Sequence, residues 1–518
     1  MERKWWTLIA VSVAMFMLLL DITVVNVALP DIQRSLHSSF ADLQWVVNAY
    51  SLTLAAFLLT AGALSDLLGR RRVFVAGLIV FTLSSAACGL SGSPLVLNLA
   101  RAVQGLGGGM MFATSLALIA GAFHGRERGT AFGVYGGVIG AAVAVGPVVG
   151  GVITSGIGWE WIFFVNVPIG IGAVALTLSQ VDESRDPDAR GVDWAGLITF
   201  SGSLFLLVFA LVQGNEKGWG STQIVSFLIG SAVLIALFLI VELRQERPMF
   251  DLTLFRKRAF TGASIAALAI SSSMFAMFLY LTLYVQDVLG YTPVQAGLRF
   301  LPITVISFFV APVSGRLSVR IPIRILIGGG LLLVSAGLLA MSAVGPSSGW
   351  TVLIPGFLIA GAGIGMLNPP LASTAVGVVH HSRSGMASGI NNTFRQVGIA
   401  TGVAGLGAIF QHAVVSHTTT ALTHANAAAA GKGVAVAPGV LKGLVVSGSV
   451  RPYASHHPGG PTLLHAYTVG FTESLTTILL IGSGVALVGS LLSFALVRSS
   501  DFVASYEGAP EAEAAVAA

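Results

Sequence analysis

Fourteen long apolar segments, separated by short polar breaks, follow one another along this chain of 518 residues. An α-helix needs roughly 20 apolar residues to cross a bilayer. Only 9% of the residues are charged, too few to solvate a globular protein of this length. The sequence therefore predicts an all-α membrane protein. The fourteen predicted spans are 6–29, 45–64, 73–92, 95–120, 130–153, 160–180, 194–213, 223–243, 260–286, 294–315, 324–344, 351–376, 385–411 and 467–497.

Basic residues between these spans predict how the chain lies in the membrane. Loops on the N-terminal side hold sixteen Lys and Arg residues, and the opposite loops hold five. Because basic loops stay in the cytoplasm, we expect a multi-pass protein of the cytoplasmic (inner) membrane with both termini inside. The same scattered residues account for the net charge of +5 without a basic patch. The lipid bilayer is therefore an expected partner, and nucleic acid is not.

A weak internal repeat predicts two related halves. The loop after the second span reads GALSDLLGRRR (62–72), and the loop after the tenth reads GRLSVRIPIR (315–324), with Val319 in place of Asp66. Repeated halves are a common plan among transporters. We expect a six-helix bundle at 1–180, two inserted helices at 181–259, a second six-helix bundle at 260–498 and a cytoplasmic tail at 499–518.

The one long connection, residues 412–466, is rich in Ala, Gly, Pro and His and is expected to be a flexible extracytoplasmic loop. Its histidines are irregularly spaced and no carboxylate accompanies them, so a solvated loop is favoured over metal binding or pH sensing. Cys88 is the only cysteine, which excludes an intrachain disulfide. We expect no metal, no cofactor and, without a phosphate-binding loop or a catalytic constellation, no enzymatic activity.

Asp21 carries the functional prediction because it lies inside the first span. A charged carboxylate at that depth is costly in lipid, so it must face the bundle interior, find a partner or take up a proton. Burial disfavours the charged form of a carboxyl group, as a reversible proton carrier requires. Arg101, with Gln104 on the same face of the fourth span, is the matching cation. A structural hydrogen bond between helices is the alternative.

Arginines also lie inside two later spans. Arg299, near the start of the tenth, is expected to extend its charge to the interface, and Arg395, deeper in the thirteenth, to bond across helices.

Two further motifs indicate moving parts. Asp66 and Arg70 lie one helical turn apart beside Gly69 and Arg71. Such a cluster can bind an adjoining helix end in one conformation and release it in another, whereas a topology signal alone would need only the arginines. The fifth span holds many small residues that permit close helix contact, with a proline that kinks the helix. They are Gly133, Gly136, Gly137, Gly140, Gly146, Pro147, Gly150 and Gly151.

These motifs together resemble the fourteen-helix drug:proton antiporters of the major facilitator superfamily. The first-helix motif of that family is similar to LDITVVNVALP (20–30), its loop signature to GALSDLLGRRR, and its fourth-helix motif to LNLARAVQGLGGG (97–109). The fifth-helix antiporter motif matches except at Ala142, where the family has glycine. Residues 283–303 and 384–402 also look like members of this group.

The resemblance implies two six-helix bundles around a central cavity, with two extra helices between them. It implies that a substrate leaves as a proton enters, with Asp21 and Arg101 in the coupling site and Asp66 and Arg70 in a cytoplasmic gate. The expected partners are protons and a hydrophobic or cationic small molecule, and the expected state is a monomer. The candidate cavity residues are Asn26, Gln104, Phe275, Phe278, Tyr280 and Asn368.

Two other transport functions stay open at this point. One is an exporter dedicated to an endogenous metabolite, such as an antibiotic, a siderophore or a lipid-like compound. The other is an uptake symporter, which the Gly- and Pro-rich fifth span disfavours.

Overall fold

The computed structural model describes residues 2–123, 125–185, 193–245, 250–318, 320–378, 384–428, 436, 440–441, 443–444, 450–457 and 459–498. Regular structure in these ranges is entirely helical. The α-helices are α1 (Arg3–Leu36), α2 (Phe40–Leu68), α3 (Arg70–Gly89), α4 (Pro94–Ala122), α5 (Gly125–Gly156), α6 (Trp161–Phe164), α7 (Asn166–Gln180), α8 (Trp194–Lys217), α9 (Thr222–Arg244), α10 (Arg258–Ile270), α11 (Ala276–Leu283), α12 (Pro293–Leu317), α13 (Ile323–Met341), α14 (Ile354–Gly377), α15 (Ser384–Ala428), α17 (Val450–His456) and α18 (Gly460–Leu496). Two π-helical segments, η2 (Ser271–Phe275) and η3 (Tyr284–Val288), interrupt and extend the α10–α11 span.

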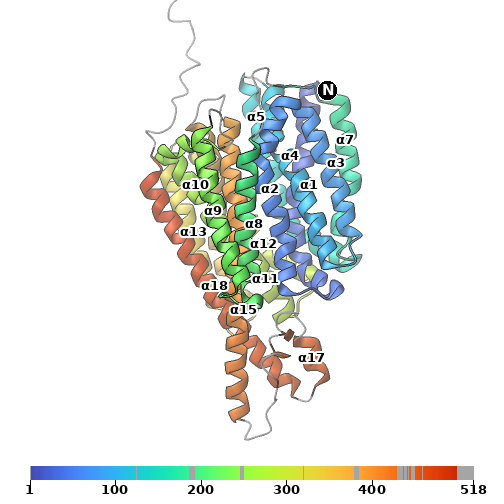
Figure 1. Ribbon diagram of the computed structural model, residues 1–518, viewed down its shortest axis with the longest axis vertical. Helices are drawn as coiled ribbons and strands as arrows, with labels where there is room; N and C mark the ends of the chain where they lie inside the picture. The colour runs from blue at the N-terminus through green and yellow to red at the C-terminus, as the bar shows by residue number, and fades with distance from the viewer. Residues whose placement is uncertain are drawn as a thin grey trace, which may run out of the picture.

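Each predicted span corresponds to a helix or a run of helices, and these lie side by side in one bundle (Figure 1). In the described ranges, twelve helices are long and apolar enough to cross a membrane, or thirteen when the bent α2 counts as one span. The span predicted at 130–153 lies in α5. The prediction of an all-α, multi-pass membrane protein is confirmed.

Local signals in the sequence fix where several helices begin. Ser39 Oγ accepts a hydrogen bond from the Asp42 backbone N–H, and the Asp42 carboxylate accepts one from the Ser39 backbone N–H, which forms a capping box at the start of α2. Thr292 and Gln295 do the same for α12. These reciprocal bonds satisfy backbone N–H groups that have no partner inside the helix, so each helix starts at a defined residue.

The connection predicted as a long loop is partly helical, and the prediction is wrong there. Helix α15 continues to Ala428 and α18 begins at Gly460, so residues 412–428 and 460–466 are helical. Alanine is the strongest helix former, and the two helices pack closely where the Cβ position of Gly470 lies 2.2 Å from Thr418 Oγ1. Figure 1 shows α15 projecting well beyond the other helices, with α17 beside it.

A carboxylate also accompanies one of the histidines, contrary to the sequence prediction. His417 Nδ1 lies 3.6 Å from Glu473 Oε2 and 3.3 Å from Ser474 Oγ. The sequence separation of these residues concealed the contact.

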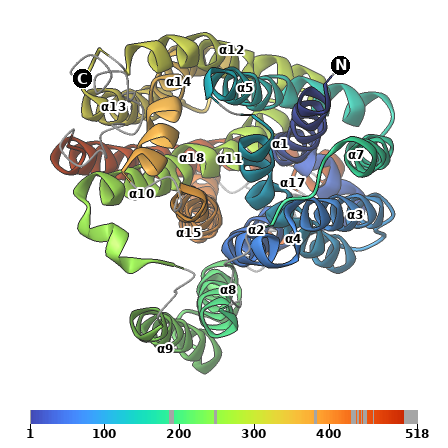
Figure 2. The same cartoon turned by 90° about the horizontal axis from the view of Figure 1, so that it is seen from above.

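Helices α1–α7 (the N-terminal helices) and α10–α15 with α18 (the C-terminal helices) occupy different sides of the bundle, with α8 and α9 outside them (Figure 2). Helix α8 packs on both α2 and α15. The Trp45 ring of α2 lies 5.9 Å from the rings of Phe205 and Phe209, and Asn215 donates to Gln411 Oε1 of α15 at 3.3 Å. The inserted helices therefore cover the seam between α2 and α15.

The two sets of helices meet at the face of the bundle opposite the start of α1, called here the far face. Gln44 Nε2 donates to the Val403 carbonyl at 2.9 Å, and Gln286 Nε2 donates to the Val27 carbonyl at 2.7 Å. Near the same face, Val294 N donates to Ser155 Oγ at 3.2 Å. Among the described residues, these three bonds join the N-terminal to the C-terminal helices at the far face. The described conformation is thus sealed at the far face.

Candidate functional site

Asp21 and Arg101 form a fully buried ion pair. Arg101 Nη1 donates to Asp21 Oδ2 at 2.5 Å, and the two side chains are 2% and 0% exposed, respectively. Two charges without water need each other and further hydrogen bonds, because desolvation of each ion costs several kcal/mol. The predicted partnership between the first and fourth spans is confirmed.

Neighbouring helices complete the hydrogen bonds of this pair. Gln104 Nε2 and Asn166 Nδ2 donate to Asp21 Oδ1 at 2.9 and 3.1 Å. Arg101 also donates to Gln104 Oε1 at 2.8 Å and, through Nε, to the Val46 carbonyl at 3.1 Å. The guanidinium lies 4.3 Å from the centre of the Tyr50 ring. The carboxylate therefore accepts three hydrogen bonds, one of them from a cation.

Sequence reasoning missed the contribution of α7 to this site. Asn166 opens α7 and bonds both Asp21 and Ser85 of α3, the latter at 3.1 Å. Asn166 is a polar residue inside the otherwise apolar predicted span 160–180, and this pattern could have indicated its role. The site thus joins α1, α2, α3, α4 and α7, and it lies within the N-terminal helices and not on a surface between the two sets.

The glycines of α5 pack against the residues that directly follow Asp21. A Cβ atom at Gly146 would lie 1.9 Å from Thr23 Oγ1, and one at Gly150 would lie 3.0 Å from Val24 Cα. A Cβ atom does not fit at Gly146, and at Gly150 it would force Val24 to shift. The turn of α1 that carries Asp21 is therefore in direct backbone contact with α5.

The other face of α5 packs on α12, among the C-terminal helices. A Cβ atom at Gly151 would lie 2.5 Å from the Pro293 carbonyl oxygen, and one at Gly297 would lie 2.2 Å from the Pro147 carbonyl oxygen. The predicted close-contact role of Gly146, Pro147, Gly150 and Gly151 agrees with these distances. Gly133 is in α5 as predicted, but its surroundings lie outside the described residues.

The predicted gate cluster lies where α2 meets α3. Arg70 Nη2 donates to Asp66 Oδ1 at 3.0 Å. The segment after α7 packs on the same point, where Arg71 N donates to Glu183 Oε1 at 3.0 Å and Arg71 Nη1 to the Val181 carbonyl at 3.1 Å. In this conformation the cluster therefore binds the segment that follows α7, which belongs to the same half of the chain. Val319, its counterpart in the repeat, lies outside the described residues.

Gly69 cannot be replaced without strain, which gives a first prediction. Its φ is +108°, and a Cβ atom there would lie 2.6 Å from the Glu183 carboxylate. We expect Gly69→Ala to destabilise the protein by about 1–3 kcal/mol, the usual cost of a side chain in a sparsely populated backbone region. Thermal unfolding in detergent measures this, and Gly62→Ala, with no atom within 4 Å of its Cβ position, is the matched control. Equal melting temperatures for the two variants would contradict the prediction.

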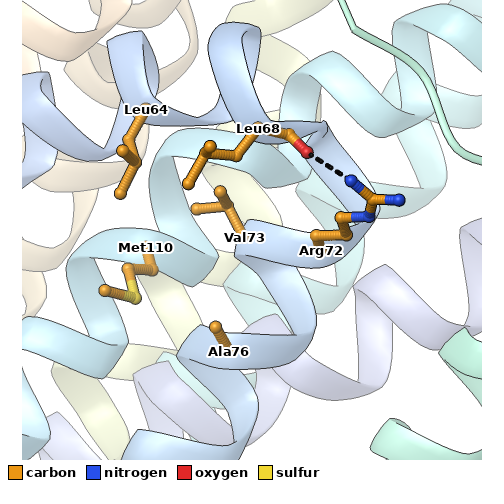
Figure 3. A pocket seen from close by; sticks show the side chains of 6 residues that line it. All are labelled: Leu64, Leu68, Arg72, Val73, Ala76 and Met110. Carbon is orange, nitrogen blue, oxygen red and sulfur yellow. Dashed lines mark hydrogen bonds between the residues drawn. The ribbon is translucent and has the colours of Figure 1, made fainter. Parts of the chain in front are cut away.

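An apolar pocket of ≈ 290 Å³ lies beside this cluster, between the ends of α2, α3 and α4 (Figure 3). Arg72 stands at its edge and donates to the Leu68 carbonyl at 3.5 Å. The lining residues are Leu64, Leu68, Arg72, Val73, Ala76 and Met110. None of the predicted cavity residues is among them, so this pocket is separate from the predicted substrate site.

The predicted cavity residues do not form one cluster. Gln104 belongs to the Asp21 site, and Asn26 bonds only the Ile22 carbonyl of its own helix among the described contacts. Tyr280 is 0% exposed and donates to the Val403 carbonyl at 2.6 Å, inside the far-face seal. Because the seal covers it, Tyr280 does not line a cavity in this conformation, and its place in a substrate cavity stays a prediction.

Three other predicted residues lie in the C-terminal helices. Phe275 and Phe278 are partly buried, with ring centres 6.4 Å apart, and Phe278 also contacts Phe300. Arg395 Nη2 donates to Asn368 Oδ1 of α14 at 2.7 Å. The prediction that Arg395 bonds across helices is confirmed.

Comparison with known proteins agrees with this architecture. The family model described as Major Facilitator Superfamily matches residues 11–403. The chain is 40% identical to the multidrug resistance protein Stp of Mycobacterium tuberculosis over 404 residues, which cover 78% of this chain and 75% of the relative. It is 35% identical to the tetracenomycin C resistance and export protein of Streptomyces glaucescens over 412 residues, covering 79% and 76%.

Solved structures support the fold. A bacterial homolog of the human lysosomal transporter Spinster, inward-facing and occupied, matches with a TM-score of 0.62 at 17% identity, covering 96% of this chain and 98% of that one. A peptide transporter in complex with sulfate matches with a TM-score of 0.63 at 15% identity, covering 94% of each chain. From the family match and these relatives, the chain belongs to the Major Facilitator Superfamily.

Proposed function

We propose that this chain is a proton-coupled antiporter that exports hydrophobic or cationic small molecules from the cytoplasm. The N-terminal face of the bundle would then be cytoplasmic, in line with the excess of Lys and Arg in its loops. The described conformation, sealed at the far face, would be the one that accepts substrate from inside the cell. Relatives named as multidrug and antibiotic resistance proteins support export as the direction.

The observation that carries the proposal is the buried Asp21–Arg101 pair and its link to α5. Protonation of Asp21 removes the charge that Arg101 needs, and a lone buried guanidinium is unfavourable. The turn of α1 that holds Asp21 contacts α5 through Gly146 and Gly150, and α5 contacts α12 through Gly151. A shift of the α1 turn that carries Asp21 would therefore move α5, and with it the contact between α5 and α12 that joins the two sets of helices.

This geometry favours coupling through conformation over direct competition for Asp21. The carboxylate is 0% exposed and has three donors in the described conformation, so a substrate has no access to it. Coupling then requires only that proton and substrate favour different conformations. Asp21 would take up the proton when the far face is open. It would release the proton when the far face is sealed, because Arg101 stabilises the charged carboxylate in that conformation.

The test is proton movement driven by substrate in proteoliposomes. Purified protein is reconstituted with a pH-sensitive dye inside, and chemically diverse compounds are added one at a time. The proposal predicts that some hydrophobic or cationic compounds exchange for protons and that a protonophore abolishes their accumulation. Transport of such compounds without any proton flux, or accumulation driven by sodium, would refute it.

A dedicated exporter of an endogenous compound is the second candidate. It is favoured by relatives named as a tetracenomycin C resistance and export protein and as a probable actinorhodin transporter. Such a protein would respond to one chemical family in the same assay, whereas a multidrug exporter would respond to several.

A further inference from the structure

Arg395 is a cation deep in α15 whose only described hydrogen-bond partner is a neutral side chain. It donates to Asn368 Oδ1 at 2.7 Å, and the described residues supply no ion pair for it. Arg395 follows the first residue of α15, Ser384, by eleven positions, which places it about 17 Å along the helix. Ionisable residues at membrane depth are costly and mark functional sites by default.

The helix faces show which way Arg395 points. One face of α15 packs on α10 at Gly398, whose Cβ position lies 2.7 Å from the Leu268 carbonyl oxygen. Another face meets α2 at Val403, whose carbonyl accepts the hydrogen bond from Gln44. At 3.6 residues per turn, Arg395 shares a face with Asn391, which donates to the Ala263 carbonyl of α10 at 3.3 Å, and with Gly402, whose Cβ position lies 2.6 Å from Ser272 of η2. It therefore lies on the face of α15 that packs on α10 and η2, about 12 Å along the helix from Val403 on the side away from the seal.

The charge cannot be neutralised within its own half of the chain. Residues 260–498 contain ten Lys and Arg side chains and two carboxylates, Asp287 and Glu473. Asp287 is in η3, which directly precedes the far-face start of α12, and Glu473 pairs with His417 in the α15 extension. Both carboxylates lie at or beyond the far face, whereas Arg395 lies deeper in the bundle, toward the face where α1 starts.

Asn368 is suited to orient this guanidinium. It directly precedes Pro369 and Pro370 inside α14, where the missing backbone N–H groups locally interrupt the helix. Its amide oxygen accepts a hydrogen bond from one of the five N–H groups of Arg395. Both side chains are partly exposed. Donors therefore remain in a fixed, planar arrangement that matches an oxyanion.

We infer that Arg395, positioned by Asn368, binds the carboxylate or a similar oxyanion of an amphiphilic compound that the protein exports. This rests on the proposed export function and extends it, because it adds acidic compounds to the hydrophobic and cationic ones. The binding site lies on the C-terminal helices, apart from the proton-binding pair on the N-terminal helices. The two sites act on different ions, and a variant at one leaves the other intact.

The test is equilibrium binding to purified protein in detergent, read by intrinsic tryptophan fluorescence. Three probes share one aromatic scaffold and carry a carboxylic acid, its methyl ester or a primary amine. For the acid, we expect Arg395→Gln to raise the dissociation constant at least about tenfold, the usual effect of losing a charged hydrogen bond. The ester should bind with unchanged affinity, and Arg395→Lys should restore part of the affinity for the acid.

A second variant leaves the arginine in place. Asn368→Asp supplies the carboxylate that the C-terminal helices lack beside Arg395, so it should weaken binding of the acid by a similar factor and strengthen binding of the amine. Arg299→Gln is the control, since its guanidinium lies over the Tyr291 ring at 3.5 Å, near the far face. Equal affinity of wild type for acid and ester, or equal losses for all three probes in the Arg395 and Asn368 variants, would overturn the inference.

The binding assay also separates this inference from the proposed function. Because it needs no proton gradient, acid binding that depends on Arg395 would persist even if the protein exchanged no protons.

Discussion

Asp21→Asn is expected to abolish proton-coupled efflux while the protein still inserts in the membrane. The amide has a similar shape but cannot carry the negative charge that pairs with Arg101 at 2.5 Å. Removing one partner of a buried pair costs about 3–5 kcal/mol, so thermal stability in detergent should also fall. The measurement is substrate-driven proton flux in proteoliposomes, compared at equal amounts of reconstituted protein.

A second variant distinguishes lost coupling from lost folding. Asp21→Asn combined with Arg101→Gln removes both charges, which should recover much of the stability but none of the coupling. Asp31→Asn is the matched control, because Asp31 lies in the same helix and pairs with the largely exposed Arg34. Undiminished proton flux in the Asp21→Asn variant would refute the proposed role of this residue.

Gly151→Leu is expected to have the second large effect, by opening the far-face seal. A Cβ atom at this position would lie 2.5 Å from the Pro293 carbonyl oxygen, so α5 and α12 must separate. Overpacking of this kind costs about 1–3 kcal/mol, which corresponds to a shift of about 5- to 150-fold in a conformational equilibrium. Transport should fall by a comparable factor, because the sealed conformation becomes less populated.

Thiol labelling can measure the seal directly. Val27→Cys places a reactive group beneath it, where Val27 is 1% exposed, and the native Cys88 is fully buried. A membrane-impermeant maleimide added outside the cell should modify this cysteine faster when Gly151→Leu is also present. Gly156→Leu, in the same helix with no atom within 4 Å of its Cβ position, should leave the labelling rate unchanged. Identical rates in the two backgrounds would contradict the role of Gly151.

The membrane spans and the central ion pair could be predicted from the sequence because each has a local physical cause. Apolar runs of sufficient length must cross the bilayer, and a carboxylate such as Asp21 inside one of them must find a partner. Arg101 was the only cation at comparable depth in the early spans, so the pairing followed. The glycines of α5 likewise indicated close contact before the neighbours were known.

Other features depend on contacts between distant residues and were not accessible in this way. Asn166 joins the ion pair from a helix 145 positions away in sequence, and its role depends on how α7 packs. Tyr280 was expected to face a cavity, but it is buried in the seal because α11 and α15 approach one another there. Composition made residues 412–428 resemble a loop, whereas packing against α18 extends α15 through them.

The length of α15 has a mechanical consequence. Its 45 residues span about 67 Å, roughly twice the thickness of a bilayer's hydrocarbon core. A stiff rod anchored in the membrane amplifies any change in its own inclination. With about 35 Å projecting, a tilt of about 10° would displace the free tip by about 6 Å. A change in the tilt of the buried helices would then be measurable beyond the bilayer, as a displacement of the projecting end of α15.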